Sequence, residues 1–168
     1  GNSEGASTNA LQYAEMIQKV NAIYGPVNGY IAHSFGGIGL SLAMENMPHD
    51  ASTKIVFIAP ATETTSAIDG ALTMLNINDA AIRKAFDDII MEKSGHPTEW
   101  FSVRRAVKNI TAEILWIHDE DDDITPLSDA VKVKEDHHNN IQFIITKGLG
   151  HRKIYHDAAV KKAVANFF

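Results

Sequence analysis

The sequence predicts an α/β fold in which helices enclose a parallel β-sheet. Four short apolar runs resemble buried strands, helical patterns lie between and around them, and the composition suits one buried core. With 168 residues, of which 45% are hydrophobic and 21% charged, the chain is long enough for a single globular domain. Alternation of strands and helices is typical of parallel strands joined by crossover helices.

The predicted strands are rich in β-branched or aromatic residues and do not alternate with polar residues, which is expected of strands buried on both faces. They cover residues 30–32, 55–58, 114–117 and 141–145. The helical patterns cover residues 10–22, 37–47, 127–135 and 155–167.

Residues 63–109 separate the second and third predicted strands and are too many for a plain crossover. Their apolar positions indicate amphipathic helices. We interpret this segment as a helical cap inserted into a core formed by residues 1–62 and 110–168, because such insertions sit over active sites. The alternative is a set of additional helices packed along one face of the sheet.

Composition argues against several classes of function. The net charge is −6 and Lys and Arg form no basic stripe, which disfavours nucleic acids and anionic membranes as partners. The chain has no cysteine, and this excludes a disulfide framework, a thiolate metal site and a cysteine nucleophile. No apolar run approaches the ~20 residues of a membrane helix. We expect a soluble, cytoplasmic protein.

Residues 29–37, Gly-Tyr-Ile-Ala-His-Ser-Phe-Gly-Gly, place Ser34 where a strand ends and a glycine-rich helix begins. A nucleophilic serine at such a turn is strained, and its hydroxyl projects above the sheet. Small neighbours are needed because the strand and the helix pass close together, and Ala32, Gly36 and Gly37 meet this need. The helix start also directs its N–H groups at charge that develops near the serine oxygen.

A second serine fits the strict pattern Gly-x-Ser-x-Gly better than Ser34 does, since Ala32 replaces the first glycine there. Ser3 lies in Gly1-Asn2-Ser3-Glu4-Gly5, with no strand before it and no apolar helix after it. The pattern has meaning only in that context, so we favour Ser34. The simpler alternative is that Ser34 is an ordinary serine that caps a helix.

The segment Ala-His-Ser-Phe-Gly-Gly around Ser34 resembles the nucleophile elbow Gly-His-Ser-x-Gly-Gly of the α/β-hydrolase family. The resemblance implies a parallel sheet of that type, and catalytic residues in the chain order Ser, Asp, His. Residues 114–126 resemble the family's apolar strand followed by Gly-x-x-Asp-x-x-x-Pro, with Asp119 in place of the glycine. Counting back from Pro126 selects Asp122, and Asp121 and Asp123 remain alternatives.

The acidic run at residues 119–123 has two other interpretations. One is a solvated loop. The other is a calcium loop, since alternate acids have the initial spacing of an EF-hand. Ile124 stands where that loop needs glycine and Ala130 where it needs glutamate, so we do not expect calcium there.

A histidine behind a glycine after the last predicted strand resembles the family's general-base loop and selects His151. His156 is an alternative base. For His33 and His118, packing or hydrogen bonding is a better interpretation than proton transfer. The remaining histidines lie in polar surroundings, and no pair has zinc-ligand spacing with a third ligand beside it, so no metal is expected.

The resemblance implies a serine hydrolase that acts without a cofactor on a small-molecule ester or thioester. Ser34 would be the nucleophile, His151 the base and Asp122 the acid that orients it, with the backbone N–H of Phe35 in the oxyanion hole. The alternatives are a non-catalytic binding protein of the same fold or an inactive fragment.

The family's second oxyanion donor comes from a loop after its third strand, and no segment before Ser34 resembles that loop. We therefore expect the chain to begin in the middle of the fold, with the first strands absent. The nucleophile strand would then expose its edge, and a second chain or copy would cover it, because bare apolar edges aggregate.

Overall fold

The computed structural model describes residues 7–168, so Ser3 lies outside the described residues. Within that range the strands form one parallel sheet in the order β1-β2-β3-β4. The strands are β1 (Gly29–Ser34), β2 (Lys54–Pro60), β3 (Glu113–Asp119) and β4 (Ile141–Thr146). This arrangement confirms the predicted fold class, and each strand contains the apolar run that predicted it.

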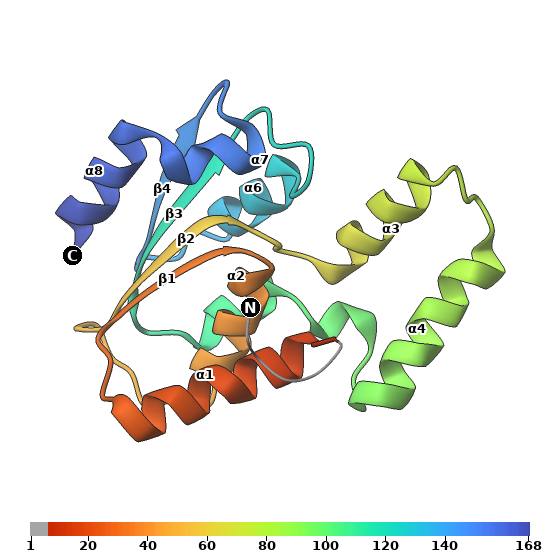
Figure 1. Cartoon of the computed structure of the whole chain (residues 1–168), viewed down its shortest axis with the longest axis horizontal. Helices are drawn as coiled ribbons and strands as arrows, with labels where there is room; N and C mark the ends of the chain where they lie inside the picture. The colour runs from red at the N-terminus through yellow and green to blue at the C-terminus, as the bar shows by residue number, and fades with distance from the viewer. Residues whose placement is uncertain (1–6) are drawn as a thin grey trace.

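Helices cover both faces of the sheet (Figure 1). On one face, α1, α2 and α6 pack against Ile55, Phe57 and Trp116, and on the other α8 packs against Val56 and Leu115. Both central strands are therefore buried on both faces, which explains their continuous apolar sequences. The helices are α1 (Ala10–Tyr24), α2 (Phe35–Met44), α6 (Leu127–Glu135) and α8 (Ala158–Phe167).

Two predicted helix boundaries were wrong. Helix α2 begins at Phe35 rather than at residue 37, directly after the serine, and ends at Met44. The last predicted helix is divided: α7 (Gly150–Lys153) and a 3₁₀ turn, η3 (Ile154–His156), precede α8. The side chain of Asp157 accepts hydrogen bonds from the first N–H groups of α8, and such a cap sets the start of a helix.

The inserted segment, residues 63–109, leaves the carboxyl end of β2 and returns beside its own starting point. The backbone N–H of Thr64 donates to the carbonyl of Phe101 over 3.2 Å, and the Ser102 hydroxyl donates to Glu63 over 2.9 Å. The segment comprises α3 (Thr64–Met74), α4 (Ala80–Ser94), η1 (Thr98–Trp100), α5 (Val103–Ala106) and η2 (Val107–Asn109).

The two long helices of the inserted segment project beyond the carboxyl ends of the strands, as Figure 1 shows, instead of lying along a face of the sheet. Helix α4 has no buried residue, and α3 buries only Leu72. By contrast, Val103 and Val107 of the returning part belong to the main core beside α2. The projecting part of the segment is therefore α3 and α4. Among residues 7–168, no helix is long and apolar enough to cross a membrane.

Candidate active site

Ser34 ends β1 and immediately precedes α2, in a backbone conformation that a residue with a side chain rarely adopts. Its φ is 55° and its ψ is −125°. Such a conformation costs about 1–3 kcal/mol and persists only where the surroundings enforce it. The pairing of β1 with β2 is irregular at this residue, and the Ser34 carbonyl accepts a bond from the N–H of Ala61 over 2.9 Å. The turn therefore directs the hydroxyl away from the strand.

The close passage of strand and helix requires glycine at only one of the two positions named from the sequence. A Cβ at Gly37 would lie 2.4 Å from the Cβ of Pro60, a clash with the end of β2. A Cβ at Gly36 would meet only Ala32, at an ordinary 3.8 Å. Gly37 is thus the residue that lets α2 approach the sheet.

The imidazole of His151 joins the serine to a carboxylate. Its Nε2 lies 2.9 Å from Ser34 Oγ, and its Nδ1 lies 2.9 Å from Oδ2 of Asp122. A carboxylate accepts hydrogen bonds only, so Nδ1 carries the proton and Nε2 is free to accept the serine hydroxyl. The structure thus brings together three residues separated by 117 and 29 positions in the chain.

Asp122 is held as an ionised carboxylate by several donors. Oδ1 accepts the N–H groups of Ile124 and Thr125, and the Thr125 hydroxyl donates to Oδ2 over 2.9 Å. Burial alone would raise the pKa of Asp122, but the bonds from His151 and Thr125 outweigh it and hold the pKa below its usual value. The carboxylate therefore faces His151 with a negative charge at neutral pH.

The two alternative acids lie elsewhere on the same turn. Asp121 is exposed and accepts the N–H of Gly148, and Asp123 is exposed. The alternative base, His156, is exposed and lies beside the ring of Tyr155. No group of three possible metal ligands occurs among residues 7–168.

Two further histidines support the site through hydrogen bonds. The Nε2 of His33 donates to the carbonyl of His151 over 3.1 Å, and the two rings lie 4.6 Å apart. The Nε2 of His118 donates to the carbonyl of Thr125 over 2.8 Å, which fixes the turn that carries Asp122. Burial lowers the pKa of His118, so this fully buried imidazole stays neutral.

Sequence reasoning missed the part that Asp119 plays, because it considered this residue only as a substituted glycine or a calcium ligand. The side chain is fully buried at the end of β3 and accepts bonds from the segment that leads to His151. Asp119 stands directly after an apolar strand, where the family has glycine. A charged residue at that position was the signal that could have indicated a buried carboxylate with hydrogen-bond partners of its own.

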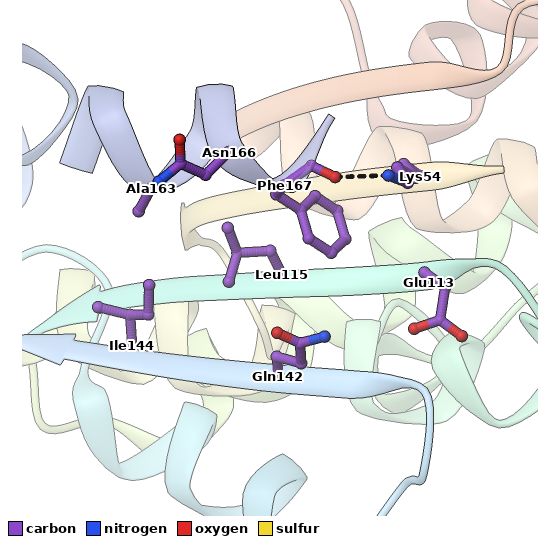
Figure 2. Close-up of a pocket in the computed structure, with 8 residues that line it drawn as sticks. All are labelled: Lys54, Glu113, Leu115, Gln142, Ile144, Ala163, Asn166 and Phe167. Carbon is purple, nitrogen blue, oxygen red and sulfur yellow. Dashed lines mark hydrogen bonds between the residues drawn. The ribbon is translucent and has the colours of Figure 1, made fainter. Parts of the chain in front are cut away.

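Cavities lie both beside the candidate site and away from it. One, of about 530 Å³, opens beside the base and is lined by Asp121, Asp123, Ile124, Leu149, Gly150, His151, Arg152 and Lys153. Figure 2 shows another, of about 450 Å³, between α8 and the face of the sheet formed by β3, β4 and the start of β2. There the Lys54 Nζ donates to the carbonyl of Phe167 over 2.6 Å. None of Ser34, Asp122 and His151 lines this second cavity, so it is separate from the candidate active site.

No family model and no curated protein matches this sequence. Solved structures do match its fold. A monoacylglycerol lipase from Paleococcus ferrophilus superposes with a TM-score of 0.63 at 18% identity, over 98% of this chain and 75% of that one. Mouse alpha/beta hydrolase domain-containing protein 10 superposes with a TM-score of 0.63 at 16% identity, over 99% of this chain and 71% of that one. A meta-cleavage product hydrolase from Pseudomonas fluorescens superposes with a TM-score of 0.62 at 16% identity, over 100% of this chain and 74% of that one.

The likeness extends over nearly the whole chain, although the sequences have diverged. These matches establish that the chain has the α/β-hydrolase fold, and they confirm the fold that the elbow sequence predicted.

Proposed function

We propose that this protein is a serine hydrolase that cleaves a carboxylic ester or thioester through an acyl-enzyme intermediate. The observation that carries the proposal is the continuous chain of hydrogen bonds from the Ser34 hydroxyl through His151 to Asp122, with 2.9 Å at each step. The fold adds support, because the structures named above that share it include a lipase and a meta-cleavage product hydrolase.

In the first half of the reaction, Ser34 Oγ attacks the acyl carbonyl as its proton passes to Nε2 of His151. The imidazolium then gives this proton to the departing alcohol or thiol, which leaves an ester on Ser34. In the second half, His151 removes a proton from water, and the resulting hydroxide attacks the acyl group. The proton returns to Ser34 and the acid is released.

Asp122 contributes in two ways. Its bond to Nδ1 keeps the imidazole in the tautomer that can accept from Ser34, and its negative charge stabilises the imidazolium. Because the buried His118 is neutral, it does not act as a second cation beside this carboxylate, although its Nε2 lies 3.7 Å from Oδ2.

The developing oxyanion needs N–H donors, and the first residue of α2 offers one. The first N–H groups of a helix have no partner within the helix, and the helix dipole favours negative charge there. Phe35 directly follows the nucleophile and begins α2. One such donor commonly stabilises the transition state by about 3 kcal/mol.

We propose that α3 and α4 form a cap that binds the apolar part of the substrate. They project beyond the carboxyl ends of the strands (Figure 1), the end at which Ser34 closes β1, and they carry exposed apolar side chains, including Met74, Phe86, Ile89 and Met91. Apolar surface of this kind suits an acyl chain or an apolar alcohol.

The test is hydrolysis of p-nitrophenyl butyrate by the wild-type protein and by Ser34→Ala, with Ser52→Ala as a control at an exposed serine. Loss of the nucleophile should lower kcat by about 10⁴-fold or more, whereas the control should retain full activity. Turnover by folded Ser34→Ala at the wild-type rate would reject the proposal. A wild-type protein that neither hydrolyses esters nor reacts with a fluorophosphonate would instead support a binding protein.

A further inference from the structure

Asp119 is a buried carboxylate that the proposed reaction does not use. It is the last residue of β3, directly before the turn formed by residues 120–123, and it pairs in register with Thr146 at the end of β4. The segment after β4, residues 147–150, leads directly to His151, and we call it the histidine loop. Burying a carboxylate fully costs folding free energy unless hydrogen-bond donors surround it, so the donors around Asp119 are part of what holds this region together.

Four donors converge on this carboxylate. Oδ1 accepts the N–H of Gly150 over 2.9 Å and that of Asp121 over 3.0 Å. Oδ2 accepts the Thr146 hydroxyl over 2.6 Å and the N–H of Leu149 over 3.2 Å. The carboxylate thus ties the end of β4, both residues before the base, and the turn that carries Asp122 to one point.

The histidine loop needs such an anchor because its backbone is bent sharply on both sides of Leu149. Gly148 has φ 83° and Gly150 has φ 59°, both in the left-handed region. The bend aims the N–H groups of consecutive residues inward, where a carboxylate can accept them. Gly150 immediately precedes His151, so a shift at its N–H would be passed to the imidazole.

The charge of Asp119 matters as well as its shape. Burial alone would raise the pKa of Asp119, but the hydrogen bonds from Thr146 and Gly150 outweigh it and hold the pKa below its usual value. The side chain is therefore ionised at neutral pH. An ionised carboxylate accepts at both oxygens and carries no proton of its own, which suits a side chain surrounded by four donors. An amide of the same shape would turn its NH₂ group toward N–H or O–H donors and lose bonds on that side.

We propose that Asp119 is a positioning residue for His151: it holds the histidine loop so that the imidazole reaches Ser34 Oγ and Asp122 together. This inference rests on the proposed function, in which His151 is the base. Because the imidazole must meet two partners at 2.9 Å each, a small displacement of the loop would break the relay.

The main test compares Asp119→Asn with Glu120→Gln in the hydrolysis of p-nitrophenyl butyrate. Glu120 lies on the same turn, and its carboxylate pairs with the exposed side chain of Lys147, the first residue of the histidine loop, at 3.0 Å. The control therefore removes an equal charge from the loop's surroundings but leaves the backbone bonds at Leu149 and Gly150 in place. We expect Asp119→Asn to lower kcat by about 10–100-fold with KM within about twofold, as a displaced catalytic group does. Glu120→Gln should behave as wild type.

A double-mutant comparison separates positioning from a general loss of structure. In a His151→Ala background there is no imidazole to position, so Asp119→Asn should change the residual kcat by less than about twofold. An equal loss in both backgrounds would overturn the proposal. Thr146→Val removes the 2.6 Å bond to Asp119, together with a longer 3.4 Å contact to the carbonyl of His118, and leaves the carboxylate in place. It should lower kcat by less than Asp119→Asn does, and it serves as the test if Asp119→Asn does not fold.

A measurement without substrate distinguishes this inference from the proposed function. A histidine N–H bonded to a buried carboxylate gives a far-downfield proton resonance, expected here for His151 Nδ1 in wild type and in Glu120→Gln. Asp119→Asn should lose or shift it. An unchanged resonance in Asp119→Asn, or none in the wild type, would overturn the positioning role even if esters are hydrolysed. A protein that hydrolyses no ester but shows these changes would reject only the proposed function.

Discussion

The Nδ1 atom of His151 lies 2.9 Å from Oδ2 of Asp122, whose side chain is fully buried beneath the base. Asp121 and Asp123, one position away on either side, are exposed. The acidic turn therefore presents one carboxylate to the imidazole and two to solvent or to backbone.

We predict that Asp122→Asn will lower kcat for ester hydrolysis by about 10³–10⁴-fold, because an amide favours the wrong imidazole tautomer. Asp123→Asn makes the same chemical change on the exposed side of the turn and should have little effect. Steady-state kinetics of the two variants decide between the registers that the acidic run allows. A large loss of kcat in Asp123→Asn with none in Asp122→Asn would show that Asp123, and not Asp122, orients the base.

The stability of the fold should fall as the pH is lowered, in two ranges. Burial lowers the pKa of His118 from 6.5, so its contribution is complete above pH 6.5 and is lost as the pH falls toward the lowered value in the folded protein. Asp119 and Asp122 also have lowered pKa values, and their contributions are lost only below 3.8, the value of a free side chain.

Urea unfolding between pH 8 and pH 3 would measure this dependence. His118→Gln should flatten the change below pH 6.5 and leave the acidic range intact, whereas Asp119→Asn should reduce the change below 3.8. Stability that rises as the pH falls from 6.5 to 5 would contradict the assignment of a neutral, buried His118.

Gly37 and Gly36 are neighbours at the start of α2 with different steric surroundings. We predict that Gly37→Ala destabilises the protein by about 1–3 kcal/mol, since its Cβ would overlap Pro60 and force the helix from the sheet. Gly36→Ala should be tolerated, because its Cβ would make an ordinary contact with Ala32. Urea denaturation of the two variants tests this contrast, and equal losses would argue against Pro60 as the obstacle.

Strand β1 forms an edge of the described sheet, and Ile31 on it is 58% exposed. We propose that a second chain or a second copy covers this edge, because unpaired apolar edges associate. Light scattering over a range of concentrations should give a mass above that of one chain, and Ile31→Lys should shift it toward the monomer. A wild-type protein that remains a monodisperse monomer would refute the proposal.

Much of the fold could be predicted from local sequence because the central strands are buried on both faces. Ile55–Ile58 and Ile114–Ile117 read as continuous apolar runs for that reason, and their positions agree with β2 and β3. Helix ends were less predictable. The break before α8 depends on Asp157 bonding to N–H groups, and an apolar periodicity that continues through the break does not reveal such a bond.

By itself, the sequence determined which residues are chemically suited to a serine hydrolase and in which order they occur. Only the tertiary structure decided that Ser34, His151 and Asp122 meet at hydrogen-bond distance, that Gly37 rather than Gly36 is sterically required, and that Asp119 holds the histidine loop. The reason is physical: periodicity and turn propensity act over a few residues, whereas these contacts join the ends of different strands, brought side by side by burial of the sheet.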